Sequence, residues 1–165
     1  NFIKWNSDIN LNKSILSDYS VNTRFVFQKL VSDRGLINSE QINITGPGQM
    51  SGFESGNMSG DQGYFLRTEV SKSFFPFLKG DENLKAKSIR IEPYIHLGVG
   101  ATYYDRPASG EFSRTEVASG GYGLKLNIPL NSNNLNISFE VAEADKSVAG
   151  TNSKPVFLLN ATFSF

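Results

Sequence analysis

The chain lacks cysteine altogether and contains one histidine among 165 residues. Disulfide bonds and thiolate metal sites are therefore excluded. A zinc site is not expected either, because there is no cluster of His and Cys. A charge surplus is also missing, since 16 Lys and Arg balance 16 Asp and Glu. With no basic excess, the composition gives no sign of nucleic-acid binding, and we expect no metal and no cofactor.

Long apolar runs are absent as well. No segment reaches the roughly 18 consecutive apolar residues of a membrane helix, and no signal peptide opens the chain. The hydrophobic fraction of 39% resembles that of a soluble protein. A transmembrane β-barrel has a similar average, because only every second residue faces lipid. The opening stretch NFIKWNSDINLN reads like the inside of a strand, so we expect a fragment or a mature C-terminal part.

What the sequence does contain is hydrophobicity with a period of two. In SIRIEPYIHLGVGATYY, residues 88–104, apolar side chains take every second position, and Arg90, Glu92, His96 and two glycines lie between them. Strict alternation of this length indicates a strand. It exceeds the roughly 9 to 11 residues that cross a membrane at a tilt. Similar patterns predict eight strands, at about 2–13, 20–31, 39–46, 62–74, 87–104, 115–130, 134–145 and 155–165.

These strands predict an all-β fold, a transmembrane antiparallel β-barrel domain over residues 1–165. Links of unequal length fit this class, because outer-membrane barrels combine tight turns such as 131–134 with long outer loops such as 46–62. A soluble β-sandwich or lipocalin also alternates with period two. The faces opposite the apolar ones are too uniformly polar or glycine for a packed interior, and this favours the barrel.

Residues 39–70 carry a more specific pattern. They resemble the C-terminal barrel of two-partner secretion transporters of the haemolysin-activator type, within the superfamily that includes the barrel-assembly insertase. That family reads like L-x-S-S-E-Q-F-x-L-G-G-P-x-x-V-R-G-F, then a spacer, then S-G-D-x-G-W-Y-L-R-N-E-L. The matching positions here are Ser39-Glu40-Gln41-Ile42, Gly46-Pro47, Gly52-Phe53, Ser59-Gly60-Asp61, Gly63 and Leu66-Arg67-Thr68-Glu69.

The resemblance implies that the chain holds the last eight of sixteen strands, without the periplasmic N-terminal domains. It also implies that loop 46–62 folds back into the pore. The residues that it assigns fall into three groups. The loop motif comprises Ser51, Gly52, Phe53, Gly60 and Asp61, and the wall that contacts it comprises Arg67, Glu69, Glu92, Tyr94, His96 and Gly98. Phe163 and Phe165, in the last strand, match the signal that outer-membrane proteins present to their assembly machinery.

Two departures from the family pattern concern the loop. Ser51 stands where the family has an Arg, and His96 stands where it has an Asp. In the family these two charges are thought to meet in the lumen and hold the loop. The change of both together predicts a neutral contact, in which Ser51 and His96 share a hydrogen bond if they meet. His96 is interpreted either as an ordinary wall histidine or as a pH-sensitive latch, since imidazole gains a proton near neutral pH.

The resemblance implies a non-enzymatic transporter of the bacterial outer membrane that exports a large adhesin or cytolysin to the cell surface. Its partners would be the secreted exoprotein, membrane lipid and lipopolysaccharide, and the assembly machinery. The lumen would offer polar side chains such as Arg24, Glu92, Lys125 and Glu140. Two alternatives stay open: a self-contained eight-stranded barrel for adhesion or scaffolding, and an insertase for other barrel proteins. No nucleophile, base and orienting group are arranged for catalysis.

Overall fold

A computed structural model describes residues 2–32, 35–76, 89–107, 112–130, 133–145 and 154–164. Seven strands form one antiparallel sheet in the order β1-β2-β5-β6-β7-β8-β9. Their bounds are β1 (Lys4–Leu16), β2 (Tyr19–Leu30), β5 (Gln62–Lys72), β6 (Arg90–Tyr103), β7 (Arg114–Leu130), β8 (Asn133–Ala144) and β9 (Val156–Ser164). Within these ranges, no helix combines the length and apolar character needed to span a membrane.

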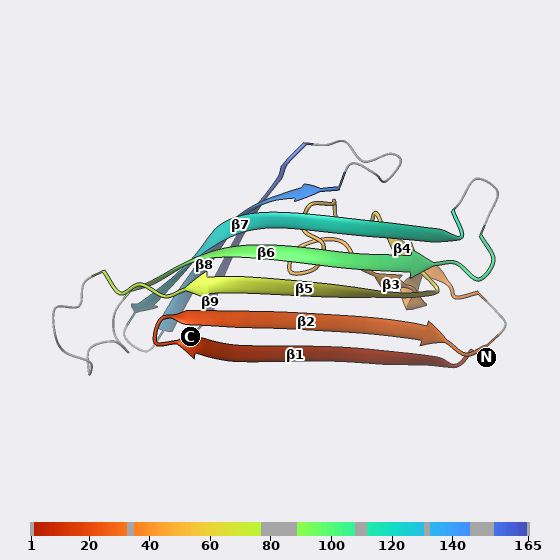
Figure 1. Cartoon of the computed structure of the whole chain (residues 1–165), viewed down its shortest axis with the longest axis horizontal. Helices are drawn as coiled ribbons and strands as arrows, with labels where there is room; N and C mark the ends of the chain where they lie inside the picture. The colour runs from red at the N-terminus through yellow and green to blue at the C-terminus, as the bar shows by residue number, and fades with distance from the viewer. Residues whose placement is uncertain are drawn as a thin grey trace.

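The sheet is strongly curved. In Figure 1, β8 and β9 turn behind the front strands, so the sheet has a convex outer face and a concave inner face. β1 and β9 are the two edges of the sheet, which is therefore an open, curved wall in the described part of the chain. The predicted fold class, an all-β antiparallel sheet of the barrel type, is confirmed.

The two faces of the wall differ in chemistry as the alternation predicts. The register places Val70, Ile95 and Tyr122 side by side on the outer face of three neighbouring strands. On β6, Leu97 is 74% exposed, whereas its neighbour His96 is 2% exposed. Apolar side chains thus face outward and polar ones are buried, the reverse of a soluble sandwich, whose core is apolar. This pattern suits a sheet whose outer face contacts hydrocarbon.

One predicted strand is wrong. Residues 39–46 do not enter the wall, because β2 pairs directly with β5. They contain a 3-10 turn (Asn38–Glu40) and the short strand β3 (Ile42–Asn43), which pairs with β4 (Ser59–Gly60). The backbone reverses after β3 because Gly46 and Gly48 adopt φ angles of 120° and 72°, which only glycine reaches without strain. In the described part of the chain the wall consequently has seven strands where eight were predicted.

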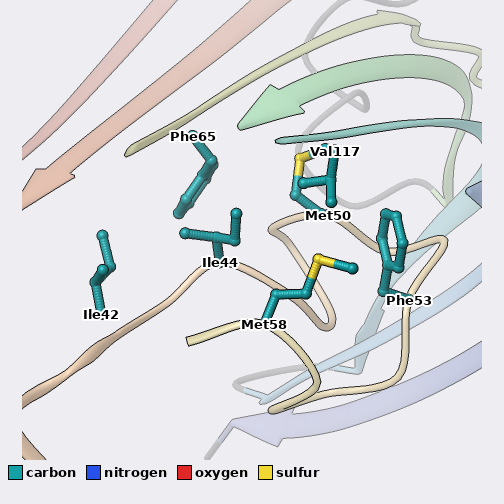
Figure 2. Packing of buried hydrophobic residues seen from close by; sticks show 7 residues of the cluster. All are labelled: Ile42, Ile44, Met50, Phe53, Met58, Phe65 and Val117. Atoms are coloured by element: carbon teal, nitrogen blue, oxygen red, sulfur yellow. The ribbon is translucent and has the colours of Figure 1, made fainter. Parts of the chain in front are cut away.

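Residues 35–61, here called the inward segment, lie against the concave face of the wall, behind β5 and β6 in Figure 1. Their apolar side chains form the main hydrophobic cluster of the protein (Figure 2). The segment supplies five of its members and the wall supplies two: Ile42, Ile44, Met50, Phe53 and Met58, with Phe65 of β5 and Val117 of β7. The apolar core therefore lies between the segment and the wall.

Candidate functional site

A buried ion pair lies at the centre of the concave face. Arg67 of β5 and Glu140 of β8 are 6% and 7% exposed. Arg67 Nη2 lies 2.7 Å from Glu140 Oε2, and Arg67 Nη1 lies 3.4 Å from Glu140 Oε1. Two parallel contacts of this kind fix the orientation of both groups. Removing one partner of a buried pair leaves an uncompensated charge, so the pair constrains β5 and β8 relative to each other.

Two side chains of β6 complete the surroundings of Glu140. The Tyr94 hydroxyl donates a hydrogen bond to Glu140 Oε2 at 2.7 Å. His96 Nε2 lies 3.1 Å from Glu140 Oε1, although neither imidazole nitrogen forms a well-aligned hydrogen bond. Glu140 therefore receives contacts from β5 and β6 at once, and its carboxylate is the common partner of Arg67, Tyr94 and His96.

Two glycines on β7 leave room for side chains of β6 to reach Glu140 on β8. Tyr94 pairs with Gly123, and Gly123 pairs with Glu140 on the next strand. A Cβ atom at Gly123 would lie 2.4 Å from Tyr94 Cζ, and one at Gly121 would lie 2.7 Å from His96 Nε2. Both distances are too short for real contacts, so side chains of β6 reach across β7 only because these positions lack a Cβ.

The inward segment binds the ion pair through neutral acceptors. Arg67 Nη1 donates a hydrogen bond to the Gln49 carbonyl oxygen at 3.1 Å and another to Ser51 Oγ. The hydrogen bond considered between Ser51 and His96 does not form, because neither nitrogen of His96 has a hydrogen-bond partner in the described part of the chain. The two residues instead contact opposite ends of the same Arg67–Glu140 pair. The structure therefore shows no neutral Ser51–His96 contact, and Ser51 binds a charged residue of the wall.

Gly52 and Gly98 allow the closest approach of the segment to the wall. A Cβ at Gly52 would lie 2.4 Å from the carbonyl oxygen of Glu143, at the end of β8. A Cβ at Gly98, the neighbour of Arg67 on β6, would lie 2.9 Å from Met50 Sδ. Because backbone atoms of β8 cannot move as a side chain can, Gly52 is the tighter of the two contacts.

Asp61 joins the base of the inward segment to the link after β6. Its side chain is buried, and the residue is 2% exposed. One carboxylate oxygen accepts a hydrogen bond from the backbone N–H of Leu36 at 2.7 Å, and the other accepts one from the N–H of Asp105 at 3.0 Å. Gly60, next to it, packs against the backbone of Tyr103. These contacts hold both ends of the segment near the C-terminal end of β6.

The remaining predicted wall residues lie elsewhere on the inner face. Glu69 forms an ion pair with Lys125 of β7 and lies 3.8 Å from Arg67 Nη2. Glu92 accepts a hydrogen bond from Ser73 and pairs with Arg90, so its described contacts are within the wall and not with the inward segment. Of the predicted terminal signal, Phe163 is half exposed in β9 and Phe165 lies outside the described residues.

A hollow of about 400 Å³ adjoins the ion pair on the concave face. Pro47 and Gly48 at the tip of the inward segment line one side of it. The rest of its lining comes from the wall and combines the leucines of β9, Leu158 and Leu159, with polar side chains that include Arg24, Arg67, Lys125, Ser138, Glu140 and Asn160. Within the described ranges, no group of three or more His, Cys, Asp or Glu side chains is placed to hold a metal ion.

Glu140 is the residue whose importance the sequence conceals. Alternation places it on the polar face of its strand, but the family motif lies in residues 39–70 and does not extend to it. The sequence shows only that Glu140 is an acidic residue on the inner face of its strand, and such residues are common in the lumen wall of any barrel. Pairing with Arg67 depends on the curvature of the sheet, because two strands lie between β5 and β8.

The sequence was compared with models of known protein families. The family model described as "Haemolysin secretion/activation protein ShlB/FhaC/HecB" matches residues 1–126. No curated protein matches the chain.

Proposed function

Because the chain belongs to the haemolysin secretion/activation family ShlB/FhaC/HecB, whose members are two-partner secretion transporters of the outer membrane, we propose that it forms part of the wall of such a transporter, which exports a large adhesin or cytolysin to the cell surface. The inward segment, which includes residues 46–61 of the expected loop 46–62, occupies the pore while the transporter is at rest. Its partners are the secreted exoprotein, lipid and lipopolysaccharide around the wall, and the outer-membrane assembly machinery.

The main support for this proposal is that the wall exposes apolar side chains on its outer face and buries polar ones on its inner face, the opposite of a soluble sheet. Ile95 and Leu97 are exposed on the outer face, and Arg67 and Glu140 are buried on the inner face beneath the inward segment. A sheet with an apolar outer surface is favourable in hydrocarbon, and a polar inner face is favourable around an aqueous path. A segment held on the inner face by a few polar contacts and a small apolar cluster is a plug that can be displaced.

The two alternatives receive less support. A self-contained eight-stranded barrel requires its first and last strands to pair, and in the described part of the chain β1 and β9 are edges. An insertase would share much of this sequence pattern, and it differs in what it acts on. Depletion of an insertase lowers every outer-membrane barrel protein, whereas depletion of a dedicated exporter lowers its partner alone.

Deletion of residues 50–60 from the full-length transporter tests the proposal. We expect the partner exoprotein to disappear from the cell surface, while heat-modifiable migration and protease resistance show that the wall still assembles. Substitution of Glu54 and Asn57 by Ala is the matched control, because both are exposed residues of the same segment. Normal export by the deletion variant would overturn the proposed role of the segment.

A further inference from the structure

The contacts of Arg67 divide into two chemical classes. Its charge is matched by Glu140, which belongs to the wall. Its contacts with the inward segment are the Gln49 carbonyl oxygen and the Ser51 hydroxyl, both uncharged. The whole tip of the segment, residues 46–53 (GPGQMSGF), contains no charged side chain. Departure of the tip therefore leaves the Arg67–Glu140 pair intact and leaves no buried charge without a partner.

Departure of the tip does leave Arg67 Nη1 with unused donor capacity. A guanidinium has five N–H donors in a fixed fork, and Glu140 accepts from Nη2 most closely. The hydrogen bonds lost on Nη1 would be those to Gln49 and Ser51. A buried donor without a partner is unfavourable, so an arriving group that supplies a carbonyl or hydroxyl oxygen replaces what the tip supplied.

The adjoining hollow is where such a group would arrive. Arg67 and Glu140 line it together with Gly48 of the tip, so an occupant of the hollow meets the ion pair and the tip at the same time. Ser138 and Asn160 add hydroxyl and amide groups that suit a peptide backbone. The three cations that line the hollow already have acidic partners: Arg67 pairs with Glu140, Lys125 with Glu69 and Arg24 with Asp8. A carboxylate is therefore disfavoured there, because it would meet Glu69 and Glu140 and find no unpaired cation among the described lining residues.

We propose that Arg67 is an exchange site, at which the backbone carbonyls and Ser or Thr hydroxyls of an extended, uncharged polypeptide stretch replace Gln49 and Ser51 and so displace the tip of the inward segment. This inference rests on the proposed export function and identifies the class of substrate that the site accepts. The incoming chain and the tip compete for the N–H groups of Arg67 Nη1, and the wall keeps the Arg67–Glu140 ion pair in both states.

The test uses the full-length transporter in lipid vesicles and a photo-cross-linkable peptide of Gly, Ser, Asn and Thr, about 20 residues long, which when extended exceeds the bilayer thickness. The concentration dependence of cross-linking gives an apparent affinity. Ser51→Ala removes an acceptor of the tip and leaves Arg67 intact, so we expect the affinity for the peptide to rise about threefold to tenfold. Ser59→Ala, on the same segment and remote from Arg67, is the matched control, with no change expected.

Arg67→Lys separates exchange from simple plugging. Lys keeps the charge for Glu140 and lacks the fork, so both the tip and the peptide lose their donor. Because the same hydrogen bonds are lost on both sides of the exchange, exchange predicts that the affinity for the peptide stays close to the parent value, unlike in Ser51→Ala. A passive plug predicts that it rises in both variants, because both loosen the tip, and that result would overturn the inference.

A second measurement does not depend on the Arg67 variant assembling. A peptide of the same length with Glu at alternate positions should bind the unmodified transporter at least about threefold more weakly than the neutral peptide. Equal binding of the two would also overturn the inference. Neither measurement uses the exoprotein or its secretion. An exporter without an Arg67 exchange site would fail these two tests and still bring its partner to the cell surface, whereas a protein that is not an exporter would bring no partner to the surface.

Discussion

Arg67 of β5 and Glu140 of β8 meet over the inner face although β6 and β7 lie between their strands. On a flat sheet three steps of about 4.8 Å would separate the two backbones by roughly 14 Å. Two features close this gap: the curvature of the wall and the length of the Arg side chain. The absence of side chains at Gly121 and Gly123 leaves the space that His96 and Tyr94 occupy beside Glu140. The pair is therefore a property of the curved sheet as a whole.

Replacement of Glu140 by Gln should destabilise the wall. The change keeps the shape of the side chain and leaves Arg67 with only the more distant Glu69, 3.8 Å away, so we expect a cost of up to about 3 kcal/mol. Urea unfolding of the full-length protein in detergent, followed by heat-modifiable migration, measures it. Glu116→Gln is the control, because the Arg114–Glu116 pair is exposed and should contribute less than about 1 kcal/mol. Equal stability of the two variants would contradict the assigned role of Glu140.

Gly123→Ala should disturb the polar centre from a strand that does not itself contact Arg67. The new Cβ overlaps the Tyr94 ring, and overpacking of this kind costs about 1–3 kcal/mol. The melting temperature in detergent is the measurement. Gly120→Ala is the matched control on the same strand, because its Cβ meets only the end of the exposed Leu97 side chain, which can turn away. We expect the control to melt close to the parent protein.

Gly52→Ala should move the tip of the inward segment away from β8. Its Cβ would overlap the backbone of Glu143, which cannot yield as a side chain can. The bound position of the tip is then disfavoured by about 1–3 kcal/mol. In planar bilayers the full-length transporter should consequently spend more time in high-conductance states. Gly35→Ala, whose Cβ would make ordinary contact with Asp61 at 3.4 Å, should leave the conductance unchanged.

Asp61→Asn should loosen the base of the segment without touching the tip. The amide is neutral and retains one acceptor oxygen in place of two, so one of Leu36 and Asp105 loses its acceptor and the other keeps a weaker, uncharged one, at a cost of about 1.5–3 kcal/mol. Hydrogen exchange followed by mass spectrometry should show faster exchange at Leu36 and Asp105. Unchanged protection of both amides would show that the carboxylate does not hold them.

Spin labels should distinguish the two faces of the wall. A label at Ile95, exposed on the outer face of β6, should collide with oxygen more than with a water-soluble nickel complex when the full-length protein is in a bilayer. A label at Asn127, on the inner face of β7, should show the opposite preference. An aqueous signal from Ile95 would contradict a lipid-facing outer surface.

The sequence by itself determined the strands and their two faces. Successive side chains of a strand point to opposite sides, so alternation in 88–104 or 134–145 is enough to place Ile95 outside and His96 or Glu140 inside. The same local pattern failed at 39–46, where a few alternating residues also suit a short strand within a folded segment. Glycines with positive φ at 46 and 48 end that strand, and the sequence does not reveal which strands pair around it.

Only the tertiary structure decided which inner-face groups meet. Ser51 and His96 stand at the two family positions whose charges are changed, and each contacts the Arg67–Glu140 pair instead of the other. That outcome depends on strand register, sheet curvature and the space left at glycines, all of which join residues far apart in the chain. Local periodicity fixes the direction of a side chain, and the distance to its partner follows from the path of the whole wall.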